Sequence, residues 1–441
     1  MANTRSIWRA TALAAAAAIA IAAVATARGV TAKAVALQPA APPSPEPITS
    51  PASANSAQPQ LSVSKRGVLL SWIERNGDLA TLKFAERTHL RQGYGGQAAS
   101  GWTPPRTVAS GRNWFVNWAD VPSVLRLPSG TLVAHWLQKS AASTYAYDVR
   151  LSYSADDGTT WSPSFTPHHD GTPTEHGFAS LFPVGDGLGL IWLDGRNMAA
   201  PPKPGEGAKS GDHGGHGGGS MTVRYARFDR AFKQVEETEI DARVCECCPT
   251  AAAVTAEGVI TAYRNRSDDE IRDNYVARMV NGKWSTPRAV FDDHWKIAAC
   301  PVNGPSLSAS GNTVVMSWFT AKNDQPNAFA AFSSDAGKTF SKPVRVDEAG
   351  TLGRVDIELL PDGSALAGWI EFANQKAQFQ VRRIDRTGAR SAPVTVAGLA
   401  GSRSSGYPRM AIANGEAVFA WTEAGDGGAL QVRTAAATLP R

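Results

Sequence analysis

The thiols of this chain are concentrated in one place. It has four cysteines among 441 residues, and three of them, Cys245, Cys247 and Cys248, stand within the stretch VCECCPT. The fourth, Cys300, follows in IAACPVNGP. Cysteine serves as a disulfide partner, a soft metal ligand or a reactive nucleophile. The sequence therefore leaves three chemistries open: disulfides, a copper or zinc site, and a catalytic thiol.

The first two chemistries make different demands. Four cysteines in an exported chain favour disulfides, for example between one of the triplet and Cys300, whereas a bridge inside residues 245–248 would be strained. A thiolate–imidazole site would instead take copper or zinc, with a histidine completing it. The candidate histidines lie together in PHHDGTPTEHG and are His168, His169 and His176.

The N-terminus predicts export to the periplasm or the extracellular space. Residues 1–27 combine two arginines, an apolar run and a final Ala-Thr-Ala, which are the three parts of a signal peptide. The apolar run is short for a spanning helix, so we expect no stable membrane span after cleavage. Residues 28–60 are rich in Pro, Ala and Ser and predict a disordered tether before a folded unit at 61–441.

A short pattern recurs along residues 61–441: a Gly turn, then an apolar β-rich run ending in an aromatic residue. Four short strands per repeat predict an all-β fold, a β-propeller of four-stranded blades, with seven blades favoured and six as the alternative. The last repeat lacks a fourth strand, which the segment just before Leu61 could supply to close the ring. The repeated aromatic residues are Trp72, Trp136, Trp192, Tyr263, Trp318, Trp369 and Trp421.

Two copies of a sharper motif lie between the third and fourth strands of their repeats. SADDGTTW at 154–161 and SSDAGKTF at 333–340 both fit S-x-D-x-G-x-[ST]-[WF]. Asp156 and Asp335 can accept backbone hydrogen bonds within such a turn. The motif resembles the Asp-box, or BNR repeat, of the sialidase superfamily of exported propellers. The resemblance implies an arginine triad for a carboxylate, a Tyr/Glu nucleophile pair and an Asp acid/base, on the face opposite the Asp-boxes.

In a propeller, the loops between blades and those joining the second and third strands open on one face. This topology places both cysteine stretches and the histidine stretch there, together with most of the polar candidates. The catalytic candidates are Asp120, Asp170, Glu175, Asp194 and Tyr407. The candidates for binding an anionic ligand are Arg112, Arg196, Arg266, Arg354 and Arg403.

Two functions compete at this face. The first is exo-sialidase-type glycoside hydrolysis or glycan binding, with a glycan or small anionic ligand as partner. The alternative is a non-catalytic propeller that binds copper, zinc or a protein partner through its Cys/His cluster. The net charge of +5 is spread along the chain without a long basic run, so we expect no nucleic-acid partner. We expect a monomer.

Overall fold

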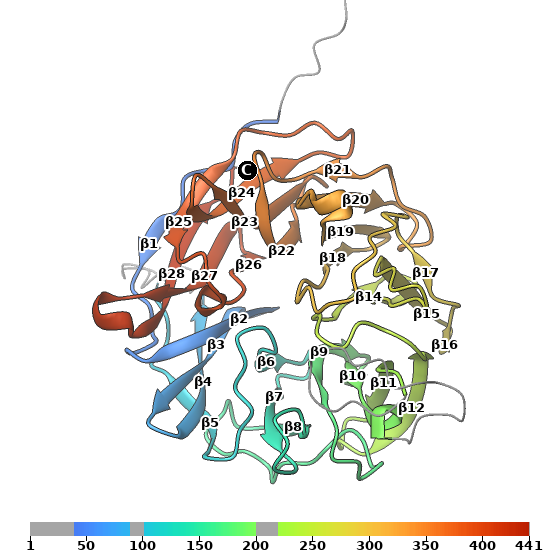
Figure 1. Ribbon diagram of the computed structural model, residues 1–441. Coiled ribbons are helices and arrows are strands. Elements are labelled where there is room, and N and C mark those ends of the chain that lie inside the picture. Colours follow the sequence, from blue (N-terminus) through green and yellow to red (C-terminus); the bar gives the residue numbers. More distant parts are fainter. Residues whose placement is uncertain (1–38, 89–100, 200–218, 441) are drawn as a thin grey trace, which may run out of the picture. The chain divides into compact units, whose positions relative to one another are not determined.

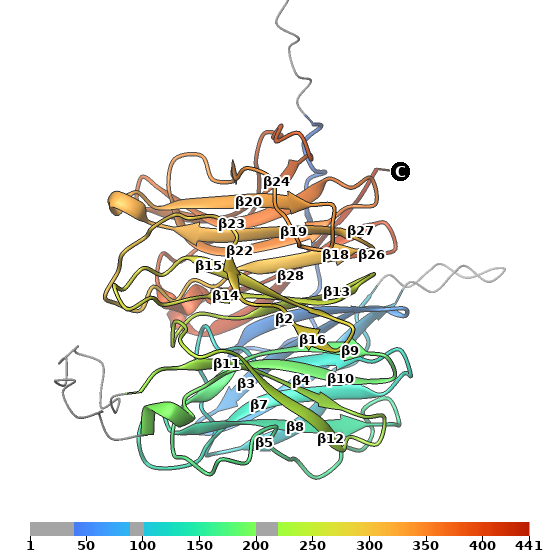
Figure 2. The same ribbon diagram turned by 90° about the vertical axis from the view of Figure 1, so that its right-hand side faces the viewer.

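The chain forms a closed ring of β-sheets in the computed structural model, which describes residues 39–88, 101–199 and 219–440. Seven sheets surround a central axis in this part of the chain (Figure 1), and Figure 2 shows the same ring from the side. The predicted all-β propeller with seven blades is confirmed. The predicted signal peptide and the beginning of the predicted tether lie outside the described residues.

Each blade is an antiparallel sheet whose strands follow one another in sequence. The first three blades are β2 (Ser56–Ser64), β3 (Gly67–Asn76), β4 (Leu79–Thr88), β5 (Arg106–Gly111); β6 (Ser123–Arg126), β7 (Leu132–Lys139), β8 (Tyr147–Ser154); and β9 (His176–Val184), β10 (Gly187–Asp194), β11 (Thr222–Phe228), β12 (Gln234–Asp241). The next two are β13 (Ala251–Thr255), β14 (Gly258–Arg264), β15 (Asn274–Val280), β16 (Lys283–Trp284), β17 (Arg288–Ala289); and β18 (Ser306–Ser310), β19 (Thr313–Thr320), β20 (Asn327–Ser333), β21 (Val344–Arg345). The last two are β22 (Thr351–Leu359), β23 (Ala365–Ala373), β24 (Lys376–Ile384), β25 (Val394–Leu399); and β26 (Arg409–Ala413), β27 (Glu416–Ala424), β28 (Leu430–Thr438).

The N-terminal strand β1 (Glu46–Ile48) completes the last blade. It pairs with β28 in the sheet order β1-β28-β27-β26, so the two ends of the described chain meet in one sheet. This confirms the predicted closure but corrects the predicted boundary, because β1 and the start of β2 lie inside residues 28–60. Composition missed them because Pro47 is tolerated in an outermost strand, where its missing N–H costs no ladder bond.

The repeated aromatic residues pack between blades. All seven lie on the second strand of a blade and are at most 6% exposed. The buried hydrophobic clusters each join two neighbouring blades, including the first with the last. Several indoles also donate to the carboxylate two residues onward, as Trp72 Nε1 does to Glu74 (2.9 Å) and Trp369 Nε1 to Glu371 (2.6 Å). These carboxylates accept hydrogen bonds from indole N–H groups, so their role is structural.

The two S-x-D-x-G-x-[ST] turns have the same hydrogen bonds. In the first, Ser154 Oγ donates to Asp156 Oδ1 at 2.8 Å and accepts from the Gly158 amide at 2.8 Å. Asp156 in turn accepts from the amide and the hydroxyl of Thr160. The turn at 333–340 repeats each of these bonds. The motif therefore shapes a turn after the third strand.

Removal of β1 should loosen the whole ring. A chain beginning at Ser56 leaves the edge of β28 unpaired, whereas one beginning at residue 39 keeps the β1–β28 pairing and the bond from Thr434 Oγ1 to the Ile48 carbonyl (3.1 Å). We expect the shorter chain to lose about 1 kcal/mol of unfolding free energy per hydrogen bond removed. Urea titrations of the two chains measure this, and equal midpoints would contradict it.

Candidate functional site

Inter-blade loops from several blades meet on one face of the ring. The loop before β13 carries the cysteine triplet, and the loop before β18 carries Cys300. The two loops touch, since a Cβ on Gly304 would collide with the carbonyl oxygen of Pro249. Arg264 ties them further by donating to the carbonyls of Asn303 (2.8 and 3.0 Å) and Arg272 (2.6 Å).

The four thiols lie near one another. Cys245 Sγ lies 3.2 Å from Cys248 Sγ and 3.7 Å from Cys247 Sγ. Cys247 and Cys300 affect each other's pKa. No disulfide joins the four cysteines in this structure. Burial raises the pKa of Cys245 to about 11. Although burial opposes it, hydrogen bonds from Cys245 and Cys247 lower the pKa of Cys248, and the bond to Cys247 lowers that of Cys300.

A buried guanidinium faces the thiols. Arg272 is 3% exposed and directs Nη1 at Cys245 Sγ (3.2 Å) and Glu246 (2.9 Å). Its Nη2 donates to Glu270 (3.0 Å). A positive charge at this distance favours thiolate over thiol.

A second group consists of two buried carboxyls bridged by a tyrosine. Tyr147 Oη lies 2.5 Å from Glu175 Oε1 and 3.2 Å from Asp120 Oδ2, and all three side chains are buried. Gly177 leaves room for them, because a Cβ there would collide with Asp120 Oδ2. Burial raises the pKa of Asp120 to about 7 and that of Glu175 to about 8, against hydrogen bonds that lower both.

The histidines form a third group, separate from the thiols. His168 and His176 stack on each other among Asp148, Asp170 and Asp194. Among the described residues, three groups of candidate metal ligands have their ligand atoms within 4.8 Å of one another. None of these groups contains both a cysteine and a histidine. His169 is exposed and contacts Gln234 of β12 (3.1 Å). The structure therefore separates the Cys and His ligands that the sequence combined.

The predicted arginines do not meet as a triad. Arg112 is exposed and pairs with Asp78, and Arg266 pairs with Glu270 and Glu246. Arg196 pairs with Asp194 (2.7 Å) and Glu237 (2.9 Å). Each guanidinium has its own carboxylates, so no common point is left for one substrate carboxylate.

Two further predicted arginines lie against one indole. The guanidinium carbon of Arg354 is 4.6 Å from the Trp118 ring centre, and that of Arg403 is 6.0 Å from it. Arg354 is buried and donates to the carbonyls of Ser402 and Gly406, whereas Arg403 is exposed. Tyr407 stacks on the Trp118 ring, with ring centroids 6.0 Å apart, and its hydroxyl donates to the Val302 carbonyl (2.7 Å).

Bulges in three first strands aim residues at this face. Gln58, Phe178 and Arg354 have φ between +51° and +54°, each where the register between the first and second strands of its blade shifts. Left-handed backbone is uncommon outside glycine, and a bulge redirects side chains and amides. In β9 the bulge turns the Phe178 amide onto Asp120 Oδ1 (2.8 Å).

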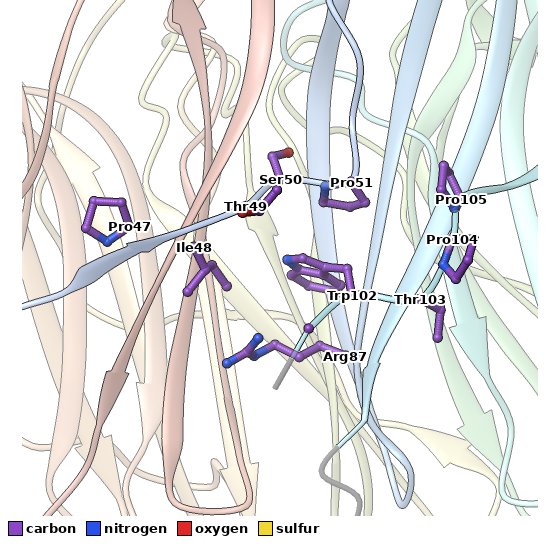
Figure 3. A pocket seen from close by; sticks show the side chains of 11 residues that line it. Pro47, Ile48, Thr49, Ser50, Pro51, Arg87, Trp102, Thr103, Pro104 and Pro105 are labelled. Carbon is purple, nitrogen blue, oxygen red and sulfur yellow. The ribbon is translucent and has the colours of Figure 1, made fainter. Parts of the chain in front are cut away.

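The first strands also enclose a cavity of about 230 Å³ around the axis. Asp120, Glu358, Tyr407 and Arg409 are among its lining residues. A larger hollow of about 600 Å³ lies beside the ring closure, against Trp102 and Arg87 (Figure 3). None of the described residues that line this hollow carries a carboxylate, imidazole or thiol. The groups able to do acid–base or metal chemistry therefore belong to the loop face and the axis.

The sequence reasoning missed Tyr147, Asp148, Trp118 and Arg272. The first two begin the third strand of their blade, and third strands begin on the same face as the inter-blade loops. That topological rule, applied to the third as well as the second strands, would have found them.

No protein-family model matches this chain, and no curated protein matches it by sequence. Solved structures do. The polysaccharide lyase Uly1 gives a TM-score of 0.51 at 11% identity, covering 87% of this chain and 90% of that one. The chain shares the fold of this lyase.

Two other solved structures match with TM-scores below 0.5. An ulvan lyase bound to -[GlcA(1-4)Rha3S]- gives a TM-score of 0.45 at 12% identity, covering 77% of this chain and 80% of that one. Trypanosoma rangeli sialidase with the inhibitor DANA gives 0.41 at 12% identity, over 77% and 57%. At such identities the likeness is one of fold.

The buried carboxyls should make stability depend on pH. In the folded chain Asp120 and Glu175 hold their protons to about pH 7 and 8, whereas in the unfolded chain they lose them near pH 4. The unfolded state binds fewer protons in this window, so stability falls as pH rises from about 4 to 8 and then levels.

Glu175→Gln should flatten this dependence by about 1.4 kcal/mol for each pKa unit that it removes. Urea unfolding at pH 5 and pH 9 measures it, with the exposed Glu257→Gln as the control. Parallel pH profiles for wild type and Glu175→Gln would contradict the assignment.

Proposed function

We propose that this is an exported propeller that acts on a glycan as a sialidase-type glycoside hydrolase. The observation that carries the proposal is the Asp120–Tyr147–Glu175 group beside the axial cavity. Glycoside hydrolysis needs a carboxylic acid that still holds its proton near neutral pH. Asp120, with a pKa of about 7, meets that need, and it lines the cavity.

The three residues take different roles in this proposal. Asp120 protonates the leaving-group oxygen, because it is the member of the group that reaches the cavity. Burial keeps the proton on Asp120, and Tyr147, which also contacts Glu175, orients the Asp120 carboxyl. Because the carboxyls interact through one hydroxyl, they titrate as a coupled pair.

An acidic sugar suits the neighbouring surface. The exposed Arg403 beside the Trp118 ring offers a positive charge. Arg403 differs in this from Arg196 and Arg266, which are paired with carboxylates. We therefore assign anion binding to Arg403.

Asp120→Asn should lower kcat on a fluorogenic sialoside by about 10²–10⁴-fold, the usual contribution of a general acid. Tyr147→Phe keeps the ring and should instead move the pH at which activity declines. Arg112→Gln, at the exposed pair with Asp78, is the matched control and should leave activity unchanged. A uronate-containing polysaccharide is the second substrate to test. Turnover of neither substrate by the wild type would refute the hydrolase proposal.

A second function rests on the thiol group. Three sulfur atoms within 4.8 Å of one another suit a soft metal such as zinc or copper(I), and Cys300 lies near Cys247 as a candidate fourth ligand. When bound, the metal would link the loops before β13 and β18. Such a site would stabilise the face with or without catalysis. Disulfides remain the competing state of the same cysteines.

Protein purified without chelators should contain one equivalent of zinc or copper, and Cys247→Ser should lower this content markedly. Metal analysis measures the content, and Arg266→Gln is the nearby control. After denaturation without reductant, four thiols should react. Two or fewer reactive thiols would show that the cysteines form disulfides and would reject the metal site.

A further inference from the structure

Two buried imidazoles form a stack that neither proposed function uses. The rings of His168 and His176 lie 3.8 Å apart at an angle of 5°, and the residues are 5% and 0% exposed. His168 comes from the loop before β9, and His176 begins β9. One carboxylate faces each edge of this stack: Asp170 on one side and Asp148 of β8 on the other.

Asp170 fixes which nitrogen of His168 carries hydrogen. Its Oδ2 lies 3.2 Å from His168 Nδ1, which is a hydrogen bond, and 3.3 Å from His176 Nε2, which is an ion-pair distance without a hydrogen bond. A carboxylate accepts hydrogen bonds, so His168 Nδ1 presents its N–H to Asp170. In the neutral His168, Nε2 then carries the lone pair. A carboxylate that orients a histidine in this way is the usual outer partner of a metal ligand.

The other edge holds two ring nitrogens without a hydrogen-bond partner. His168 Nε2 and His176 Nδ1 face Asp148 Oδ1 at 3.9 and 3.7 Å. Both atoms are buried and unpartnered, and His176 Nε2 is too. Buried acceptors left unpaired cost free energy, and an ionised carboxylate beside them raises that cost. A cation between the three atoms would remove it.

The spacing suits a metal ion. Ligands about 2.1 Å from zinc in a tetrahedral site lie roughly 3.4 Å apart. The nitrogen–oxygen distances here exceed that value by a few tenths of an ångström. Because an imidazole binds a metal along the lone pair in its ring plane, the two parallel rings would also turn toward the common ion. The Asp148 side chain is 24% exposed, which leaves an entry route and room for water as a further ligand.

We propose that Asp148 Oδ1, His168 Nε2 and His176 Nδ1 bind a divalent first-row transition metal ion of the zinc type, with Asp170 as the orienting carboxylate. Two imidazoles and one carboxylate suit zinc better than the hard cations calcium and magnesium or the soft copper(I). Nearby charge also favours a cation, since Asp194 lies 3.7 Å from His176 Nε2. Arg196 is the opposing charge, and it is already paired with Asp194 and Glu237.

Cobalt(II) distinguishes this site from the thiol group. Titration of the metal-free protein should give visible d–d bands without sulfur-to-cobalt charge transfer for one equivalent of cobalt, because its ligands are nitrogen and oxygen. A thiol-bound equivalent would add charge-transfer absorption in the near ultraviolet. The two spectra therefore count the sites separately.

Asp148→Asn should lower the affinity for the cobalt that shows no charge transfer at least tenfold and leave the affinity for any thiol-bound cobalt unchanged. Asp170→Asn should lower the first affinity about 10–100-fold, because the imidazole rings lose the carboxylate that orients them. His169→Asn is the matched control, because His169 adjoins His168 in sequence yet contacts Gln234. Circular dichroism confirms folding, and His168→Gln replaces Asp148→Asn if that variant unfolds.

Two results would overturn the proposal. One is a wild-type titration in which all bound cobalt shows sulfur charge transfer or none binds at all, which would mean that the stack is an ion-paired imidazole cluster. The other is an unchanged cobalt spectrum and affinity in the folded Asp148 and His168 variants.

Discussion

Closure of the ring is the constraint on which the rest of the structure depends. Each blade buries its second-strand aromatic residue against a neighbour, so a blade at an open end would expose a hydrophobic face. The strand β1 prevents this by completing the sheet of β26–β28. With the ring closed, the inter-blade loops are forced around one axis, and residues far apart in sequence become neighbours.

On the loop face, the thiols, the carboxyls and the imidazoles form three separate groups. Thiols occupy the loops before β13 and β18, carboxyls with Tyr147 lie between β6, β8 and β9, and imidazoles lie at the start of β9. Burial then sets the chemistry of each group. It keeps Asp120 protonated near neutral pH and raises the pKa of Cys245, whereas at Cys248 the hydrogen bonds of the neighbouring thiols outweigh burial and lower the pKa.

The separation of histidines from cysteines has a local cause. Asp170 and Asp148 hold His168 and His176 by their ring edges, and both imidazoles are buried in that stack. Sequence reasoning placed these residues on the correct face but combined them with the nearest soft ligands. It had no means of seeing that Asp148, at the start of a third strand, would face the rings.

Repetition in the sequence determined the fold. Each repeat contains an aromatic strand that must be buried between neighbouring sheets, and a closed ring of blades buries all of them. The sequence pattern therefore predicted seven blades, the second-strand positions and the shared loop face. The tertiary structure decided the pairings within that face: Tyr147 with Glu175, Arg354 with Trp118, and Asp148 with the two histidines. These depend on strand bulges, side-chain direction and burial, which are set by contacts between blades and leave no period in the sequence.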